Sequence, residues 1–243
     1  MRIKITLSYD GTDFCGWQKQ KNGVSVQGTV EDAIFALTGE RVSVVGSGRT
    51  DAGVHAKGQV AHFDTQSDVP PERFYKALNT FLPDAVKVLS SEKVSDKFNA
   101  NRTAKRKTYE YSLYVSDVEE PLKERYSVRV YGNLSIEKMR AAAETLTGER
   151  DFKAFSATGS GVKTTVRTVY GISVDKTGED IKIKVCGNGF LYNMVRIMAG
   201  ALVKTGKGEI AESDIIKALD TGDRTLLGET MPAKGLCLLG VEY

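Results

Sequence analysis

The chain has 243 residues with 34 basic and 31 acidic side chains, and its net charge of +3 does not by itself predict nucleic-acid binding. Its 41% hydrophobic and 27% charged residues are typical of a globular protein that forms one large domain or two small ones. Its three cysteines are far apart in the sequence, which excludes a disulfide framework and a zinc-binding spacing. We therefore expect a cytoplasmic protein that holds no metal.

No segment of the sequence predicts contact with a membrane. Met1–Leu7 alternates polar and apolar side chains instead of forming the apolar segment of a signal peptide. The longest apolar helix that the sequence predicts, Phe190–Lys204, is too short to cross a bilayer.

The first half of the sequence predicts alternating strands and helices. In Arg2–Tyr9 the apolar side chains recur at every second position, which is typical of a strand with one buried face. The further elements predicted here are a helix over Val26–Thr38, strands over Arg41–Ser47 and Gly58–Thr65, a helix over Pro71–Phe81 with Phe74, Ala77, Leu78 and Phe81 on its inner face, and a strand over Ala85–Ser95. Their order is βαββαβ.

The second half, from about Lys105, predicts the same order with one extra strand and one extra helix. Its predicted strands are Lys107–Val115, Tyr126–Tyr131, Lys163–Asp175, Ile181–Gly187 and Leu236–Tyr243. Its predicted helices extend from a Ser135 cap to Thr147, over Phe190–Lys204 and over Glu212–Leu219. The segment Ser156–Lys163 predicts a mobile loop.

Two successive βαββαβ segments are typical of the ferredoxin-like fold. We expect an α+β protein with one half over residues 1–104 and a second half over residues 105–243. No Pro-rich or Ser-rich linker separates these halves, so we expect them to pack together, with their antiparallel sheets joined around a central, positively charged cleft. A cleft of this kind is the natural place for a binding site.

The segment Gly46–Ala56 places an aspartate in a loop bracketed by glycines. Asp51 stands two residues after Arg49, and a carboxylate beside a guanidinium stays ionised, as an attacking or proton-accepting group must. The glycine spacing does not fit a dinucleotide-binding fingerprint, because Asp51 stands where that motif has its third glycine. It does not fit a P-loop either, because Val54 and His55 stand where a P-loop has Lys-Ser or Lys-Thr. From the spacing alone, a tight turn with a surface ion pair is an equally good interpretation.

A basic run precedes three tyrosines in the middle of the chain. Tyr109 is the first of the tyrosines that follow, and the members of the run are Lys97, Arg102, Lys105, Arg106 and Lys107. Basic side chains beside aromatic ones suit phosphate contact combined with base stacking, as in RNA binding. A solvated basic surface is the commoner outcome of such a run.

A single arginine interrupts an otherwise apolar helix. Phe190–Val203 is apolar on nearly every side, so Arg196 needs an anionic partner, for which Asp51 is one candidate. An ion pair with another acid, or a side chain that reaches solvent, is the commoner outcome. Before the helix, Asn188 stands between two glycines, which predicts a sharp turn with free backbone N–H groups.

Several of these segments resemble, in the same order, those of one enzyme family. Gly46–Val60 resembles the active-site loop of the tRNA pseudouridine synthase A family, Tyr109–Tyr111 its tyrosine motif and Gly187–Arg196 its buried-helix motif. The opening Tyr9–Gln18 and the closing Gly235–Tyr243 are also similar, so the resemblance covers essentially the whole chain.

The resemblance implies an isomerase that converts uridine to pseudouridine at position 38, 39 or 40 in the anticodon stem-loop of tRNA. It also implies a homodimer that needs neither a metal nor an organic cofactor. Asp51 would be the catalytic carboxylate, with Arg49 and Arg196 keeping it ionised and oriented. Tyr109 would stack on the uracil, and its use as a base stays open. The substrate-binding residues expected are Tyr109, Arg102, Lys105, Arg106, Lys107 and Asn188.

Two other functions stay open from the residues alone. A non-catalytic RNA-binding or RNA-folding protein would share the basic run and the tyrosines, but it gives no reason for Asp51. A hydrolase that uses a carboxylate would usually need a metal cluster or a histidine acting as acid and base, and His55 and His62 suggest neither.

Overall fold

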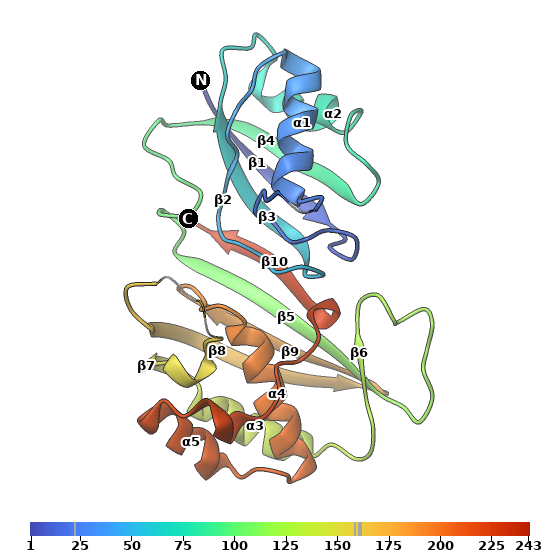
Figure 1. Cartoon of the computed structure of the whole chain (residues 1–243), viewed down its shortest axis with the longest axis vertical. Coiled ribbons are helices and arrows are strands. Elements are labelled where there is room, and N and C mark those ends of the chain that lie inside the picture. The colour runs from blue at the N-terminus through green and yellow to red at the C-terminus, as the bar shows by residue number, and fades with distance from the viewer. Residues whose placement is uncertain (22, 158, 160–161) are drawn as a thin grey trace. The chain divides into compact units, whose positions relative to one another are not determined.

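The structure, a computed structural model, describes residues 1–21, 23–157, 159 and 162–243. The chain divides into a first unit, Met1–Lys105 with Cys237–Tyr243, and a second unit, Arg106–Leu236 (Figure 1). This division falls beside the expected boundary after residue 104, but the closing segment groups with the first unit and not with the second. Positions 158, 160 and 161 of the loop predicted at Ser156–Lys163 lie outside the described residues.

The first unit is a mostly antiparallel sheet with its helices on one side (Figure 1). Its elements are β1 (Arg2–Tyr9), α1 (Val26–Thr38), β2 (Val45–Gly46), β3 (His55–Asp64), the 3-10 helix η1 (Pro71–Arg73), α2 (Phe74–Leu78), β4 (Val86–Val94) and β10 (Leu236–Glu242), whose first residue belongs to the second unit. Strand β1 lies between β4 and β3, and β3 pairs with both β2 and β10. Among the described strands of this unit, β3 and β10 run parallel and the other pairs are antiparallel.

Local sequence explains the best-predicted elements of this unit. The four apolar residues of β1 on one face, Ile3, Ile5, Leu7 and Tyr9, are all buried, as the alternation predicts. Helix α1 has the predicted ends because the side chain of its N-cap, Ser25, accepts a hydrogen bond from the backbone N–H of Gly28. At the other end, Gly39 adopts φ 74°, a left-handed conformation that favours glycine.

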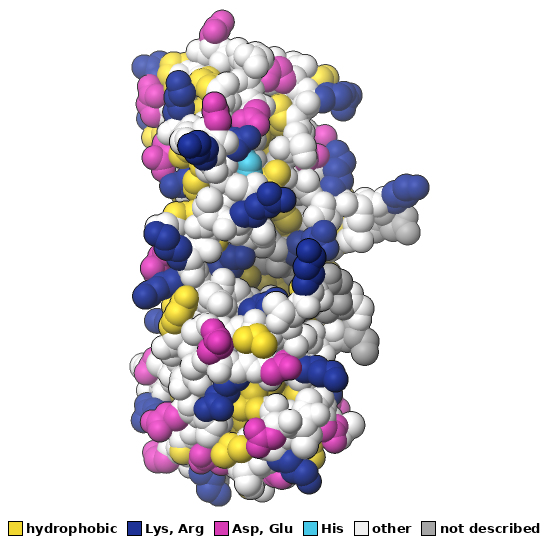
Figure 2. Space-filling view, turned by 90° about the vertical axis from the view of Figure 1, so that its left-hand side faces the viewer, with side chains coloured by type: hydrophobic (Ala, Val, Ile, Leu, Met, Phe, Trp, Pro, Cys, Tyr) yellow, Lys and Arg dark blue, Asp and Glu magenta, His cyan; other side chains and the backbone are white. Residues whose placement is uncertain are grey.

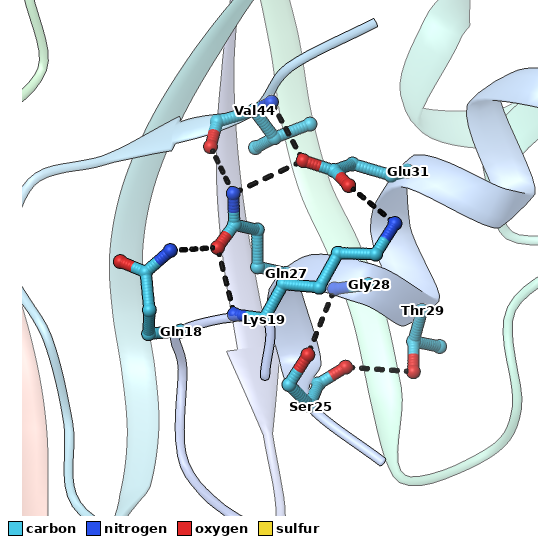
Figure 3. Close-up of polar contacts among 8 residues, drawn as sticks. All are labelled: Gln18, Lys19, Ser25, Gln27, Gly28, Thr29, Glu31 and Val44. Atoms are coloured by element: carbon cyan, nitrogen blue, oxygen red, sulfur yellow. Dashed lines mark hydrogen bonds and ion pairs between the residues drawn. The ribbon is translucent and has the colours of Figure 1, made fainter. Parts of the chain in front are cut away.

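A buried glutamine fastens the start of α1 to two neighbouring segments (Figure 3). The Gln27 Oε1 accepts hydrogen bonds from Gln18 Nε2 at 2.8 Å and from the Lys19 backbone N–H at 2.9 Å. Its Nε2 donates to Glu31 Oε1 at 3.0 Å and to the Val44 carbonyl at 3.1 Å. The amide therefore uses both of its donors and its acceptor, which offsets the cost of burying it.

The same contacts explain why the strand predicted over Arg41–Ser47 is reduced to β2. The backbone N–H of Val44 donates to Glu31 Oε1 and its carbonyl accepts from Gln27, so side chains occupy the groups that a strand would pair. The helix predicted over Pro71–Phe81 is also shorter, because only Phe74–Leu78 is α-helical. Phe81 is 49% exposed and does not belong to an inner face.

The second unit is a sheet with helices gathered on one side (Figure 1). Its strands are β5 (Arg106–Val115), β6 (Val128–Val130), β7 (Gly148–Asp151), β8 (Val166–Thr177) and β9 (Asp180–Gly187), and its helices are α3 (Ile136–Thr145), α4 (Met194–Lys207) and α5 (Glu212–Thr221), with 3-10 helices η2 (Lys153–Phe155), η3 (Arg224–Leu227) and η4 (Ala233–Gly235). The antiparallel order is β5-β9-β8-β7, and β6 runs parallel to β5. The expectation of an α+β protein with mainly antiparallel strands is confirmed.

Two features of the second unit differ from the sequence prediction. Strand β7 was not predicted because its four residues, Gly148–Asp151, are all exposed and carry no apolar alternation. Helix α4 begins at Met194 and not at Phe190, because Asn193 adopts φ 61° just before it. Among the described residues, no helix is long and apolar enough to cross a membrane.

Candidate active site

The loop that carries Asp51 connects β2 to β3 and lies along the segment that follows β1. The backbone N–H of Trp17 donates to the Thr50 carbonyl at 3.0 Å, and that of Gly53 donates to the Phe14 carbonyl at 3.4 Å. Inside the loop, the Val54 N–H donates to the Asp51 carbonyl at 3.1 Å. Backbone contacts on both sides of Asp51 therefore limit the conformations of a loop rich in glycine.

This close approach depends on glycines outside the loop itself. A Cβ on Gly11 would lie 2.0 Å from the Val54 carbonyl oxygen. A Cβ on Gly16, which adopts φ 100°, would lie 2.6 Å from the Thr50 carbonyl oxygen. Neither glycine belongs to the loop, and the only signal for them in the sequence is their place in the opening segment Tyr9–Gln18.

Buried polar side chains reinforce the approach. The Tyr9 hydroxyl lies 2.8 Å from Thr50 Oγ1, and burial raises the pKa of Tyr9 well above its usual range, so the hydroxyl stays neutral. His55 is 5% exposed, and its Nδ1 accepts a hydrogen bond from the Gly11 backbone N–H at 3.0 Å. Asp10 Oδ1 lies 3.2 Å from the same nitrogen. In the described part of the chain, no group of three or more His, Cys, Asp and Glu side chains is arranged to hold a metal ion.

The two charged residues of the loop differ in exposure. Asp51 is half-buried, whereas Arg49 is exposed. Its exposed position leaves Arg49 accessible to an anionic ligand.

Tyr109 lies on β5 of the second unit, opposite Val185 of β9. Its side chain is 8% exposed, and its ring meets that of Phe190 edge to face at 5.3 Å and 89°. On the same face of β5, Tyr111 is fully buried and its hydroxyl donates to the Pro232 carbonyl at 2.6 Å. Burial raises the pKa of Tyr111 although the charge of Arg196 opposes this shift.

Arg196 is half-buried on α4 and contacts polar groups of the second unit. Its Nε donates to the Met231 carbonyl at 2.7 Å, and its Nη1 donates to Asn193 Oδ1 at 2.7 Å. Its neighbours in the helix, Val195 and Ile197, are buried, as the apolar pattern predicts. The side chain thus ties the start of α4 to the segment before β10.

Asn188 forms a two-point contact with β8. Its backbone N–H donates to the Thr168 carbonyl at 3.0 Å, and its Oδ1 accepts from the Thr168 N–H at 3.0 Å. The prediction that this turn offers a free N–H group at Asn188 is therefore wrong, because β8 uses it. The exposed part of Asn188 is left for other contacts.

The basic run is divided between the two units. Arg102 and Lys105, at the end of the continuous part of the first unit, are exposed. At the start of the second unit, exposed Arg106 lies 4.9 Å over the Tyr170 ring, a cation–π contact. Lys107 is half-buried, and burial together with the charge of Arg167 lowers its pKa. Figure 2 shows Lys and Arg side chains, together with Asp and Glu, on the face that it draws.

Comparison with known proteins assigns the family. A family model described as tRNA pseudouridine synthase matches residues 5–102 and 142–243. The tRNA pseudouridine synthase A of Ruminiclostridium cellulolyticum is 46% identical over 243 residues, which covers 100% of this chain and 99% of that protein. The protein of the same name from Brevibacillus brevis is 44% identical over 242 residues and covers 100% of this chain and 99% of its own length.

A solved structure described as a Cbf5-Nop10-Gar1 complex is similar at a TM-score of 0.40 and 15% sequence identity. The match covers 97% of this chain and 48% of that chain, and we base no conclusion on so distant a similarity. The sequence matches extend over nearly the whole chain and include the segments that hold Asp51, Gln59 and Arg196. The chain belongs to the tRNA pseudouridine synthase family.

Proposed function

We propose that the protein converts uridine to pseudouridine in the anticodon stem-loop of tRNA, at position 38, 39 or 40, with Asp51 as the catalytic carboxylate. The observation that carries the proposal is the half-buried Asp51 on a loop that backbone hydrogen bonds hold from two sides. A loop held in this way presents its carboxylate in one orientation, as reactions of positioned groups require. The names of the full-length relatives support the substrate class.

The reaction breaks the bond from C1′ to N1 of the uridine, turns the uracil, and joins C1′ to C5. The hydrogen that leaves C5 goes to solvent and N1 gains a proton, so the change is an isomerisation that needs no other reactant. Asp51 acts in one of two ways: it attacks C1′, or it removes the 2′ proton to give a glycal. In either case the uridine must leave the stack of bases first.

The other predicted residues have supporting roles in this proposal. Tyr109 stacks on the uracil, and Arg49 and Arg196 provide the positive charge that keeps Asp51 ionised and oriented. Four residues of the basic run bind tRNA phosphates, because cations suit backbone contacts: Arg102, Lys105, Arg106 and Lys107.

The proposal extends to architecture and assembly. Each half is a ferredoxin-like α+β unit, which the strand order β4-β1-β3 with β2 beside β3 supports for the first unit. The active protein is a homodimer that binds tRNA through both subunits and uses no cofactor.

Asp51→Asn tests the proposal directly. We expect it to abolish the release of tritium from tRNA that carries tritium at C5 of uridine, because an amide is neither a nucleophile nor a base of comparable strength. The tRNA affinity and the melting temperature should stay near those of the unchanged protein, because Asn preserves the shape of the side chain.

Asp32→Asn is a suitable control, because Asp32 is an exposed aspartate of α1 in the same unit. It should release tritium at the full rate. Retained turnover in Asp51→Asn would refute the catalytic assignment. If the unchanged protein binds tRNA but releases no tritium, the proposed isomerase activity is refuted. The protein is then a non-catalytic RNA-binding protein, the other function with which the basic run and the tyrosines agree.

A further inference from the structure

Gln59 of β3 is a buried residue that contacts the loop of Asp51 without belonging to it. Its side chain is 0% exposed. Its Oε1 accepts a hydrogen bond from the Ser47 hydroxyl at 2.6 Å, and its Nε2 donates to the Gly48 carbonyl at 3.0 Å. A longer contact of 3.5 Å joins Nε2 to the Tyr9 hydroxyl. One amide therefore binds two consecutive residues at the start of the loop.

Further contacts hold two other parts of the loop, Ser47 and Thr50, and Thr50 directly precedes Asp51. The Ser47 backbone N–H donates to the Val60 carbonyl at 2.7 Å, and the Ser47 carbonyl accepts from Asn101 Nδ2 at 2.7 Å. Thr50, which is 6% exposed, lies 2.8 Å from the hydroxyl of Tyr9. Gln59 touches both Tyr9 and the Ser47–Gly48 pair, so it links the two sets of contacts.

The loop needs such external restraint because of its composition. Glycines at positions 46, 48 and 53 leave the backbone with a wide choice of conformations, so local sterics do not select one. A defined direction for Asp51 must then come from tertiary contacts. A buried amide suits this purpose, because it accepts from a hydroxyl and donates to a carbonyl at the same time.

We propose that Gln59 is a positioning residue for the isomerisation: its amide holds Ser47 and Gly48 so that the following loop presents Asp51 in the reactive orientation. The proposal rests on the catalytic role proposed for Asp51. Gln59 itself is fully buried, so it acts through the loop and does not touch tRNA. Losing the amide leaves the Gly48 carbonyl without this donor and allows the loop to shift.

A pair of matched substitutions separates positioning from simple stability. Gln59→Met and Gln27→Met each replace a buried, fully bonded glutamine of the first unit with an apolar side chain of similar length. The side chain of Gln27 makes its hydrogen bonds outside the loop, to Gln18, Lys19, Glu31 and Val44 (Figure 3). Both variants should melt at a lower temperature, since each leaves buried polar groups without a partner.

Only the Gln59 variant should lose reaction rate. With saturating tRNA labelled with tritium at C5 of uridine, we expect Gln59→Met to slow a single turnover by roughly 10- to 100-fold, because a small misplacement of a reactive group has an effect of that size. Its tRNA affinity should match that of the unchanged protein. Gln27→Met should react at the rate of the unchanged protein. Gln59→Glu, which places a carboxylate oxygen against the Gly48 carbonyl, should behave like Gln59→Met.

Equal single-turnover rates for Gln59→Met and Gln27→Met would overturn the proposal. If Gln59→Met does not fold, Ser47→Ala breaks the same link with a smaller change, and an unchanged rate in that variant would also overturn it. The two proposals fail separately: an active Asp51→Asn variant refutes the catalytic role, whereas an inactive Asp51→Asn beside a fully active Gln59→Met refutes only the positioning role.

Discussion

Tyr109 packs inside the second unit, and the same aromatic ring is proposed to stack on the uracil of the substrate. Its edge-to-face contact with Phe190 fixes the ring plane, and its 8% exposure leaves a small part of the side chain accessible. A ring that is already fixed loses little conformational freedom when a base stacks on it. This makes Tyr109 suited to stacking whether or not its hydroxyl takes part in the reaction.

Substitutions of Tyr109 separate the ring from the hydroxyl. We expect Tyr109→Leu to weaken tRNA binding by about 1–3 kcal/mol, the usual contribution of one stacked base, whereas Tyr109→Phe should bind as the unchanged protein does. Equilibrium tRNA binding measures both. Because Tyr109→Phe keeps the ring, a decrease in its single-turnover rate at saturating tRNA measures the contribution of the hydroxyl. Unchanged tRNA affinity in Tyr109→Leu would contradict the stacking role.

At the scale of elements, the short strand β2 and the segment after β1 are held together by a tryptophan. Trp17 is 2% exposed and lies against the backbone of Gly46, where a Cβ would be 2.5 Å from the indole ring. Because the ring fills the space that a side chain at position 46 would need, β2 passes directly over Trp17. The entry into the aspartate loop therefore depends on a glycine at this point.

Gly46→Ala should disturb this packing. We expect a loss of about 1–3 kcal/mol in the free energy of unfolding, the usual cost of overpacking, because the added methyl group meets a rigid ring. Urea unfolding measures it, and the fluorescence of Trp17, the single tryptophan, should change in the folded state. Gly240→Ala is the control, since no described residue other than its two chain neighbours has an atom within 4 Å of a Cβ there. Equal stability of the two variants would show that the indole ring moves aside.

At the scale of the whole molecule, the end of the chain returns to the first unit. Cys237 and Leu238 of β10 lie opposite His55 and Ala56 of β3, directly after the aspartate loop. The Tyr243 hydroxyl donates to the Ala100 carbonyl at 2.8 Å. The first unit is therefore completed only after the second unit has been synthesised, and the loop of Asp51 borders on the last strand.

Removal of residues 237–243 should destabilise the first unit. We expect a lower urea midpoint in the fluorescence of Trp17, because β3 loses a strand partner and becomes an exposed edge. Tyr243→Phe, which removes one hydrogen bond, should reduce the free energy of unfolding by only about 1 kcal/mol. An unchanged midpoint after truncation would mean that β10 adds nothing to the stability of the first unit.

Predictions from the sequence succeeded where neighbouring residues carry the information. The ends of α1 follow from Ser25 and Gly39, and the buried face of β1 follows from alternation. They failed where distant residues intervene. Val44 has the β-branched side chain of a strand residue, yet its backbone bonds to the side chains of Gln27 and Glu31.

The family and the position of Asp51 were determined by the sequence itself, because motifs and their order are linear information that folding does not alter. Only the tertiary structure decided what holds that aspartate in place. Gly11 and Gly16 allow the segment after β1 to approach the loop, and Gln59 reaches back from β3 to bind it. These contacts form through space between segments remote in the chain, so their geometry follows from the packed fold and not from any local pattern of residues.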